Sequence, residues 1–444
     1  MAKPAVITNN IDRIEVFRLK NNLQIQLVTI PGGKTTLFSV GYYAGAMYEN
    51  GFGKGSNDGV SHFTEHMFFK GTPSRSANQV NQEFSQLGAD LNAFTSYDHT
   101  IYYAKIPTRN LRKAAEIWND LLLHNMLKTQ DFEAEKQIIM QEIQIYKDMP
   151  EFNANSNVRV HHFAGTPLEH NILGSTESIS AMSLDTLKEY ISKYYSLHNA
   201  IITIVGGGFT PEAEIGFITK LFNENEKKSN QKPIYPPQIT LPRRKTKFSY
   251  FKNEINKPLS YLAICWSSPG IKSNLFFPTL LINTYLGNSR TSLIYRDIIS
   301  KGITGLCRYA FEPFYDISAS SIVFISPPEK LDEVYHKILK LLIDLYSLEF
   351  TDEIISDLKQ EVSGSYLSEI EDPTNFGIDL AQKFIKFRRP LLPSDYEKGL
   401  DVPLEIVQKT KDEIFGDKIT FTVYATGKLP SPDWIPEFPE NSPW

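Results

Sequence analysis

The stretch Ser61-His62-Phe63-Thr64-Glu65-His66-Met67-Phe68-Phe69-Lys70-Gly71-Thr72 carries the most specific signal in this chain of 444 residues. If the stretch is helical, His62 and His66 lie about 40° apart around the helix axis, and Glu65 stays within about 60° of His62. Two imidazoles and a carboxylate on one side of a helix suit a divalent metal ion with a base beside it. Histidine is scarce, with 9 in the chain, so H-x-x-E-H should arise by chance in roughly one comparable chain in a hundred.

The alternative is a helix that happens to carry two histidines and a glutamate on its surface. The apolar residues 67–69 argue against that alternative, because they favour a half-buried helix in which an imidazole pair needs a partner. Asp58 is expected to cap the start of the helix, and Gly71 to end it in the left-handed conformation.

Residues 131–147 predict a second helix whose apolar face includes Ile138, Ile139 and Ile143. Glu135 and Glu142 are two turns apart and therefore share one side of it. One of them can bind a metal while the other accepts the free N–H of a ligating histidine. Taken alone, a solvated acidic face is the simpler interpretation of this pair.

The pattern of elements repeats once along the chain, which is too long for one compact core. We therefore predict an α+β protein with two similar α+β domains, each a mixed or antiparallel sheet flanked by helices. The domains are expected at 1–222 and 248–444, joined by a polar, proline-containing linker at 223–247. The first half predicts strands at 13–17, 23–29, 36–43, 92–95, 100–106 and 199–205, and further helices at 76–87, 110–125 and 184–195. The second half predicts strands at 248–254, 260–266, 306–311, 318–325 and 419–424, and helices at 276–301, 330–346 and 352–371.

The composition is that of a folded soluble protein, with 41% apolar and 22% charged residues. The net charge of −5 argues against nucleic acid as a partner. Cys265 and Cys307 are too few for a disulfide framework or a thiolate zinc site, and we expect two core thiols. No run approaches the roughly 18 apolar residues of a membrane span, and the start has no leader pattern. A cytoplasmic location is expected, with the periplasm or the mitochondrial matrix as the alternative if a leader has been removed.

Three other features are weaker candidates for a site. Residues 51–56 lack the spacing of a phosphate-binding loop and are interpreted as an entry loop beside the site. His161 and His162 are neighbours that point about 100° apart on a helix, so they make a poor ligand pair. His99 is expected to be a residue of a strand turn rather than a substrate contact.

Further short motifs surround the metal pattern in a fixed order over about the first 210 residues. Glu142 stands 76 positions after His66. The other matches are Gly45 to Glu49 (G-x-x-x-E), Phe69 to Thr72 (F-K-G-T), Gly88 with Asn92 to Thr95 (G-x-x-x-N-A-x-T), Glu135 with Glu142, Leu173 to Ile179 and Tyr195 to Asn199. Together with H-x-x-E-H, the inverzincin signature, this set resembles the pitrilysin, insulinase and mitochondrial processing peptidase family of zinc metallopeptidases.

The resemblance implies one Zn²⁺ per chain, held by His62, His66 and Glu142, in a metalloendopeptidase. Glu65 would act as the base, and Glu135 is hypothesised to orient one histidine. The strand with Asn92, Ala93, Phe94 and Thr95 is hypothesised to offer its edge to an extended peptide substrate through backbone hydrogen bonds. Such binding implies short or unfolded peptides, enclosed in a chamber.

One part of the family pattern is incomplete in this chain. Relatives that act alone or as homodimers carry an arginine and, several residues later, a tyrosine in the second half. Arg296 is the candidate for the arginine and a substrate contact, but Thr304 stands where the tyrosine is expected, unless Tyr309 replaces it. Half-size members of the family commonly work in pairs. We therefore expect the zinc-bearing chain of a clam-like dimer, either a homodimer or a heterodimer with a similar-sized chain that carries an Arg/Tyr pair.

Two alternatives stay open. The chain can be a subunit of a presequence-processing peptidase, which would share the same site. It can also be a non-catalytic scaffold subunit of a larger complex, although the complete set of ligands argues against that role.

Overall fold

Two mixed β-sheets, each with its own helices, form the described part of the computed structural model, which is residues 5–8, 13–49, 57–223, 231–242, 248–287, 289–369, 372–391, 393–416 and 419–437. Unit 1 consists of Met1–Ile143, His170–Pro237 and Leu367–Ser394, and unit 2 of Gln144–Glu169, Gln238–Tyr366 and Asp395–Trp444. The predicted α+β class with two mixed sheets flanked by helices is confirmed.

The sheet of unit 1 has seven strands in the order β1-β2-β3-β7-β4-β6-β5. Only the β3–β7 pair is parallel, and the other pairs are antiparallel. The central strand β7 is buried along its whole length and rich in β-branched residues, as expected for a strand covered on both faces. The strands are β1 (Ala5–Thr8), β2 (Arg13–Arg18), β3 (Gln24–Thr29), β4 (Thr35–Tyr42), β5 (Asp90–Thr95), β6 (Thr100–Pro107) and β7 (Ala200–Gly206).

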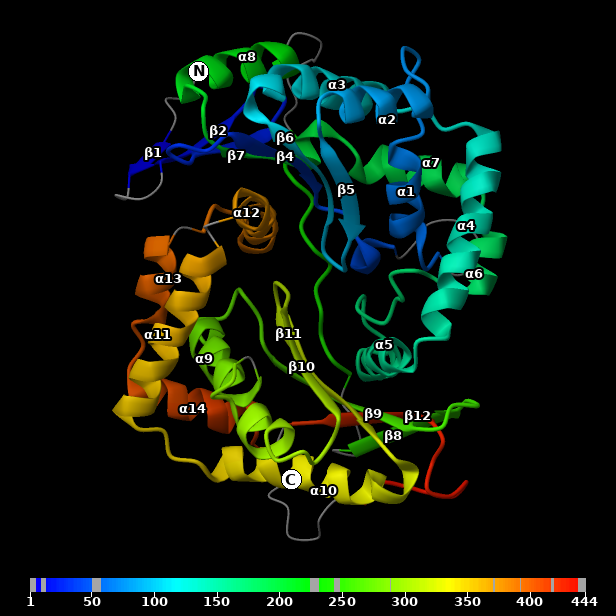
Figure 1. Ribbon diagram of the computed structural model, residues 1–444, viewed down its shortest axis with the longest axis vertical. Coiled ribbons are helices and arrows are strands. Elements are labelled where there is room, and N and C mark those ends of the chain that lie inside the picture. Colours follow the sequence, from blue (N-terminus) through cyan, green and yellow to red (C-terminus); the bar gives the residue numbers. More distant parts are fainter. Residues whose placement is uncertain are drawn as a thin grey trace. The chain divides into compact units, whose positions relative to one another are not determined.

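Helices cover both faces of this sheet, with α12 on one side and α3 and α8 on the other (Figure 1). Trp118 of α3 is fully buried and stacks on Phe38 of β4 with 5.9 Å between the ring centroids. The helices are α1 (Val60–Phe68), α2 (Ala77–Gln86), α3 (Leu111–His124), α4 (Thr129–Lys147), α6 (Thr176–Ala181), α7 (Leu184–Tyr194), α8 (Pro211–Asn223) and α12 (Pro373–Phe387), and α4 runs four residues past the end of unit 1.

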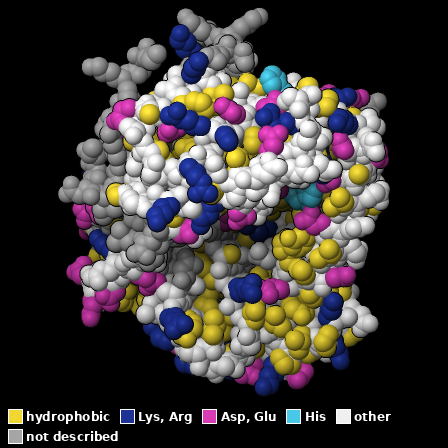
Figure 2. Space-filling model, turned by 45° about the horizontal axis from the view of Figure 1, so that its top comes forward, with side chains coloured by type: hydrophobic (Ala, Val, Ile, Leu, Met, Phe, Trp, Pro, Cys, Tyr) yellow, Lys and Arg dark blue, Asp and Glu magenta, His cyan; other side chains and the backbone are white. Residues whose placement is uncertain are grey.

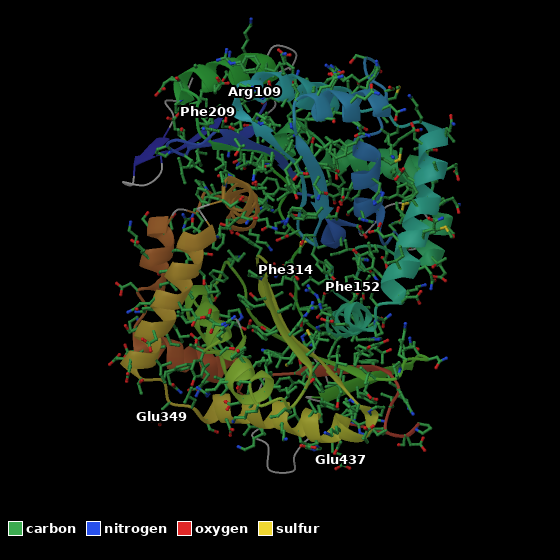
Figure 3. All side chains as sticks on the ribbon, in the orientation of Figure 1. Arg109, Phe152, Phe209, Phe314, Glu349 and Glu437 are labelled. Atoms are coloured by element: carbon green, nitrogen blue, oxygen red, sulfur yellow. The ribbon has the colours of Figure 1, made fainter. Side chains whose placement is uncertain are left out.

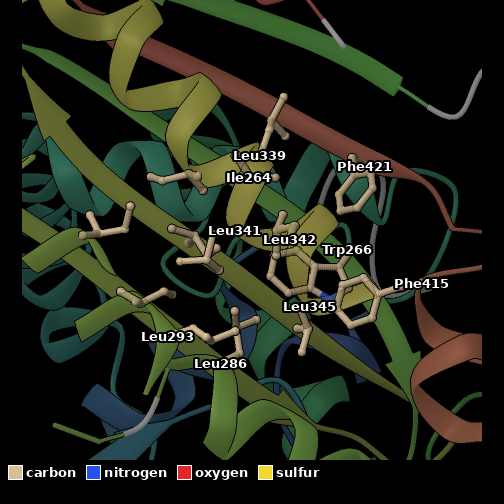
Figure 4. Close-up of a cluster of buried hydrophobic side chains, with 14 of the residues drawn as sticks. Ile264, Trp266, Leu286, Leu293, Leu339, Leu341, Leu342, Leu345, Phe415 and Phe421 are labelled. Carbon is tan, nitrogen blue, oxygen red and sulfur yellow. The ribbon is translucent and has the colours of Figure 1, made fainter. Parts of the chain in front are cut away.

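The sheet of unit 2 has five strands in the order β10-β11-β9-β12-β8. Its core is built around Trp266, whose ring lies near those of Phe415 and Phe421 (Figure 4). The strands are β8 (Phe248–Glu254), β9 (Ser260–Pro269), β10 (Leu306–Pro313), β11 (Ile317–Ser326) and β12 (Phe421–Gly427). The helices are α5 (Pro150–His162), α9 (Phe276–Gly287), α10 (Leu331–Ser347), α11 (Asp352–Glu369), α13 (Pro393–Leu400) and α14 (Leu404–Ile414).

The two sheets repeat one topology. Read from β8, the order β8-β12-β9-β11-β10 matches β3-β7-β4-β6-β5, and the first pair is parallel in both. The repeat that the element pattern predicts is therefore present in the strand order.

One helix from each half of the chain belongs to the other half's sheet. Helix α12 packs on β4 and β7 of unit 1, and α5 packs on β9, β11 and β12 of unit 2. At Gly377 a Cβ would come within 2.3 Å of a methyl carbon of Leu37, so glycine permits the close approach of α12. In unit 2, Arg159 of α5 forms an ion pair with Glu312 and lies over the ring of Phe314, which Figure 3 labels.

The division predicted at 1–222 and 248–444 differs from the compact units in these two segments, 144–169 and 367–394. The physical reason is that each helix buries its apolar face on a sheet distant in sequence. Of the predicted linker 223–247, residues 231–242 contain no helix or strand, and 224–230 and 243–247 lie outside the described residues.

Of the helices predicted within 276–301, the first is confirmed as α9, and the rest of that range is mostly irregular. Helix α9 ends at Gly287, and only a π-helical turn follows at Tyr295–Ile299. Between them, Thr291 N–H donates to Ser289 Oγ and Ser292 Oγ donates to the Ser289 carbonyl. These local bonds compete with helical ones.

The distribution of charged side chains and the burial of the two cysteines are as the composition predicts. Basic and acidic side chains are interspersed over the face drawn in Figure 2. Among the described residues, no helix combines the length and apolarity needed to cross a bilayer. Cys265 and Cys307 are buried free thiols, as expected.

Candidate metal centre

Helix α1 starts from an unusual cap. Its N-cap is Gly59, at φ +91°, which has no side chain that could accept a hydrogen bond from the first turn of the helix. The carboxylate of Glu49 takes that role, because it accepts the N–H of Gly59 at 2.9 Å and of Ser61 at 3.0 Å. The prediction that Asp58 caps the helix is wrong, since Asp58 pairs with His170 at 2.6 Å. Gly71 has φ +112°, as the predicted left-handed stop requires.

Apolar packing places α1 beside α4. The ring of Phe63 stacks on that of Phe132 with 4.7 Å between centroids and an interplanar angle of 1°. Val60, Phe63 and Met67 are fully or almost fully buried, so α1 cannot turn its polar side elsewhere without exposing them.

The polar sides of the two helices bring three metal-ligand side chains together. Ligand atoms of His62, His66 and Glu142 all lie within 4.8 Å of one another. Glu142 Oε2 is 3.7 Å from His62 Nε2 and 3.5 Å from His66 Nε2. Ligands held about 2.1 Å from a tetrahedral Zn²⁺ are separated by about 3.4 Å. The donor set and its spacing therefore fit zinc.

Glu135 fixes the orientation of one of these imidazoles. Its Oε2 lies 3.0 Å from His66 Nδ1, and its other oxygen accepts from the Lys70 ammonium. Burial raises the pKa of Glu135, but the bonds to His66 and Lys70 outweigh it and lower the pKa overall. An ionised carboxylate only accepts, so Nδ1 carries a proton, and Nε2, on the side of Glu142, is the nitrogen that would bind a metal.

The two histidines differ in charge preference. Burial, and then the neighbouring His66, lower the pKa of His62 to about 4, so His62 is neutral at pH 7. Burial also lowers the pKa of His66, but its bonds to Glu135 and Glu142 outweigh burial and raise that pKa to about 9. His66 therefore exchanges a proton for a cation when a metal binds.

Glu65 lies on the same helix but points to the end of strand β5. Thr95 Oγ1 donates a hydrogen bond to Glu65 Oε2 at 2.6 Å. Burial raises the pKa of Glu65 above its usual range, against the lowering effect of that bond. A carboxylate with a raised pKa is a better proton acceptor than a solvated one.

Strand β5 lies at an edge of the unit 1 sheet. Among the described residues it pairs only with β6, so its outer N–H and C=O groups have no strand partner. Asn92 is exposed, and Ala93, Phe94 and Thr95 are half-buried. The strand ends at Thr95, directly at the Glu65 carboxylate.

Two family models match this chain. The family model "Insulinase (Peptidase family M16)" matches residues 29–176, and "Peptidase M16 inactive domain" matches residues 181–362. The chain belongs to the M16 peptidase family.

Individual relatives are similar over most of the chain. It is 24% identical over 361 residues to "Uncharacterized zinc protease YmxG" of Bacillus subtilis, covering 81% of this chain and 85% of that protein. It is 26% identical over 448 residues to the mitochondrial-processing peptidase subunit beta of Bos taurus, covering 98% and 88%. The crystal structure of a protease from Helicobacter pylori has a similar fold, with a TM-score of 0.83 and 21% identity over 94% of this chain and all of that one.

In this M16 chain, the side chains considered for the family's arginine and tyrosine each bond to other residues of unit 2. Arg296 is exposed and pairs with Asp297 at 3.1 Å, so its assignment as a substrate contact stays a prediction. Thr304 Oγ1 donates to the carbonyls of Leu306 and Ile325. The Tyr309 hydroxyl is bonded to Ser320 and Asn283. Neither hydroxyl is available for a substrate without breaking these bonds.

The histidines that were weaker candidates for a site contact neighbouring residues of the fold. His99 is buried and pairs with Asp98 at 2.6 Å. The ring of His161 stacks on Phe251, and His162 Nδ1 lies 3.0 Å from Thr422 Oγ1. The predicted entry loop at 51–56 lies outside the described residues.

Two functional positions had no assigned role before the structure. Glu49 stands in the G-x-x-x-E match and Lys70 in the F-K-G-T match, but neither motif by itself states what the side chain contacts. Asp58 and His170 form, with Glu49, a second group of metal-ligand types. Both oxygens of Glu49 already accept backbone N–H groups of α1.

We expect Glu49→Ala to lower the free energy of unfolding by about 2–6 kcal/mol, because two buried N–H groups lose their acceptor at about 1–3 kcal/mol each. Urea denaturation of the metal-free chain measures the change. Glu116→Ala, which removes an exposed glutamate from α3, is the control and should change stability little. Equal effects of both substitutions would contradict the capping role.

Proposed function

We propose that this chain is a zinc-dependent endopeptidase that hydrolyses short or unfolded peptides. The observation that carries the proposal is the meeting of three elements: the His62–His66–Glu142 group, the Glu65 carboxylate and the end of edge strand β5. Membership of the M16 family and similarity to proteins named zinc proteases support it.

His62 and His66 from α1 and Glu142 from α4 would hold the zinc ion. When bound, Zn²⁺ polarises the scissile carbonyl and makes water acidic enough to attack near neutral pH. Glu65 takes the proton of the attacking water and returns it to the nitrogen of the departing amine. Thr95 holds one oxygen of Glu65, which leaves the other oxygen to carry the proton.

The substrate would add to β5 as an extended strand. Its backbone would pair with the outer backbone groups of residues Asn92 to Thr95, which run toward Glu65, and the N–H of Ala93 would exchange its bond to Asn92 Oδ1 for the substrate. Backbone pairing reads little of the side-chain sequence, so we propose loose specificity. A folded protein cannot offer such a segment, which restricts the substrates to short or unfolded chains.

A two-chain assembly would complete the site. The hydroxyls of Thr304 and Tyr309 are engaged within unit 2, so a second chain of similar size is proposed to supply the arginine and tyrosine. A different chain can serve directly, whereas a second copy would have to release the Tyr309 hydroxyl from Asn283 and Ser320. The similarity to a protein named as a processing peptidase subunit beta makes a processing peptidase subunit the second candidate function.

The test is hydrolysis of an internally quenched peptide by the purified chain, combined with elemental analysis. We expect one zinc per chain, loss of cleavage after treatment with 1,10-phenanthroline, and recovery on adding zinc. Activity should rise when a co-purifying chain of similar size is added back. A chain that binds zinc but cleaves no peptide, alone or with such a partner, would favour the scaffold role instead.

A further inference from the structure

A small cavity of about 230 Å³ in unit 1 lies outside the elements of the metal centre. Positive charge and tyrosine rings dominate its wall, and no acidic side chain among the described residues lines it. The lining residues are Arg18, Gln24, Tyr43, Lys232, Pro233, Tyr235 and Arg388.

Arg388 is held rigidly at this cavity by aromatic rings. Its guanidinium carbon lies 4.0 Å from the centroid of the Tyr43 ring and 4.9 Å from that of Tyr235. Its Nη1 donates to the carbonyl of Ile234 at 2.9 Å, and Nη2 is 3.5 Å from the hydroxyl of Tyr48. These contacts fix the plane of the guanidinium and leave several of its five N–H donors unused.

The backbone at Arg388 is strained. The residue ends α12 in the left-handed region, at φ +59°, a position that glycine usually takes. Among the described residues only Asn22, a residue type that tolerates this region, is the other non-glycine with positive φ. A bulky side chain at such a backbone position points to a use for that side chain.

A second arginine at the cavity is oriented by buried polar groups. Arg18 Nη2 donates to Gln24 Oε1 at 3.1 Å, and Gln24 Nε2 donates to the Tyr43 hydroxyl at 3.4 Å. Gln24 and Tyr43 are 6% and 1% exposed, so this chain of bonds is fixed. Within the described residues, neither Arg18, Lys232 nor Arg388 forms an ion pair with a carboxylate.

We propose that this cavity binds a small oxyanion, either a carboxylate or a phosphate group. Three cations around one cavity without a carboxylate repel one another, and an anion removes that repulsion. Planar guanidinium groups match the oxygens of carboxylate and phosphate. The volume is below the roughly 300–1,000 Å³ of pockets for drug-sized ligands, so a small ligand fits. The proposal does not depend on the peptidase assignment.

Isothermal titration of the full chain at constant ionic strength tests the proposal. The probes are inorganic phosphate, N-acetylglycine as a mimic of a peptide C-terminus, and N-acetylglycinamide, which has the same shape without the charge. We expect phosphate or N-acetylglycine to bind and the amide to bind at least about tenfold more weakly. Binding of phosphate alone identifies a phosphate site, and binding of N-acetylglycine identifies a carboxylate site. Binding of neither anion overturns the proposal.

Variants locate the binding in this cavity. Arg388→Gln also removes contacts that hold the end of α12, so the exposed Arg18 and Lys232 are the better targets. Arg18→Gln and Lys232→Gln should each weaken anion binding about fivefold or more. Arg109→Gln, which removes an exposed arginine elsewhere on unit 1, is the matched control and should leave binding unchanged (Figure 3). An equal loss in the control and in the cavity variants would also overturn the proposal.

Discussion

Glu65→Gln should leave zinc bound and lower kcat for peptide hydrolysis by about 10³-fold, within the range of 10²–10⁴ typical of a general base. The amide has the shape of the carboxylate but cannot take a proton from water. Because Glu65 is not one of the grouped metal-ligand side chains, elemental analysis should still find one zinc per chain. The measurement is steady-state cleavage of a quenched peptide by the variant and its parent, with the zinc content of both.

Two further variants separate the loss of the base from general damage. Glu189→Gln changes an exposed glutamate of α7 in the same way and should keep full activity. Thr95→Val removes the hydroxyl that donates to Glu65 at 2.6 Å and should lower kcat less than Glu65→Gln does. If Glu65→Gln kept the parent activity, the base would have to be another residue, and the proposed mechanism would fail.

The residues of the candidate metal centre could be predicted from the sequence, because metal binding requires particular residue types at helical spacing. Two histidines four apart must share a face of α1, whatever the rest of the fold does. The partner helix was identified through the family resemblance, since two glutamates one heptad apart are, taken alone, more simply interpreted as a solvated acidic face. The geometry then adds what spacing cannot give: Glu135 contacts His66, whereas Glu142 lies near both imidazoles.

The cap of α1 shows where local reasoning stops. A cap was expected from the adjacent Asp58, since most caps come from the residue at the helix start. The acceptor is instead the buried Glu49, ten residues before Gly59. Burial opposes the charge of Glu49 and raises its pKa to about 8, and the two N–H donors offset part of that cost. Such a contact depends on tertiary structure and leaves no local pattern.

The exchanged helices show a second limit. The apolar spacing of α12, with Phe376, Leu380 and Phe384 buried, predicts only that one face of a helix is covered. It does not say which sheet covers that face. Strand positions could be predicted from local alternation, whereas the sheet on which α5 and α12 pack could not, because both helices lie on sheets distant in sequence.

Replacing three glutamates of α4 one at a time should give three different zinc affinities. Glu142→Gln should weaken zinc binding most, by about 10³-fold or more, because a neutral amide replaces an anionic ligand. Glu135→Gln should weaken it about 10–100-fold, as expected when the partner of a ligating histidine is lost. Glu133→Gln, at an exposed position of the same helix, should have no effect. Competition with a zinc chelator of known affinity, at one pH, measures all three.

The order of the three affinities decides which of Glu135 and Glu142 is the zinc ligand, a choice that their helical spacing alone leaves open. Glu135 is held by Lys70 and by His66 Nδ1, so its oxygens face the side of the imidazole away from the Nε2 lone pair. Glu142 Oε2 instead lies 3.7 and 3.5 Å from the two Nε2 atoms, where a shared cation would lie between them. A larger loss in Glu135→Gln than in Glu142→Gln would exchange the roles of ligand and orienting residue. Equal losses in all three variants would mean that charge on α4, rather than coordination, controls zinc binding.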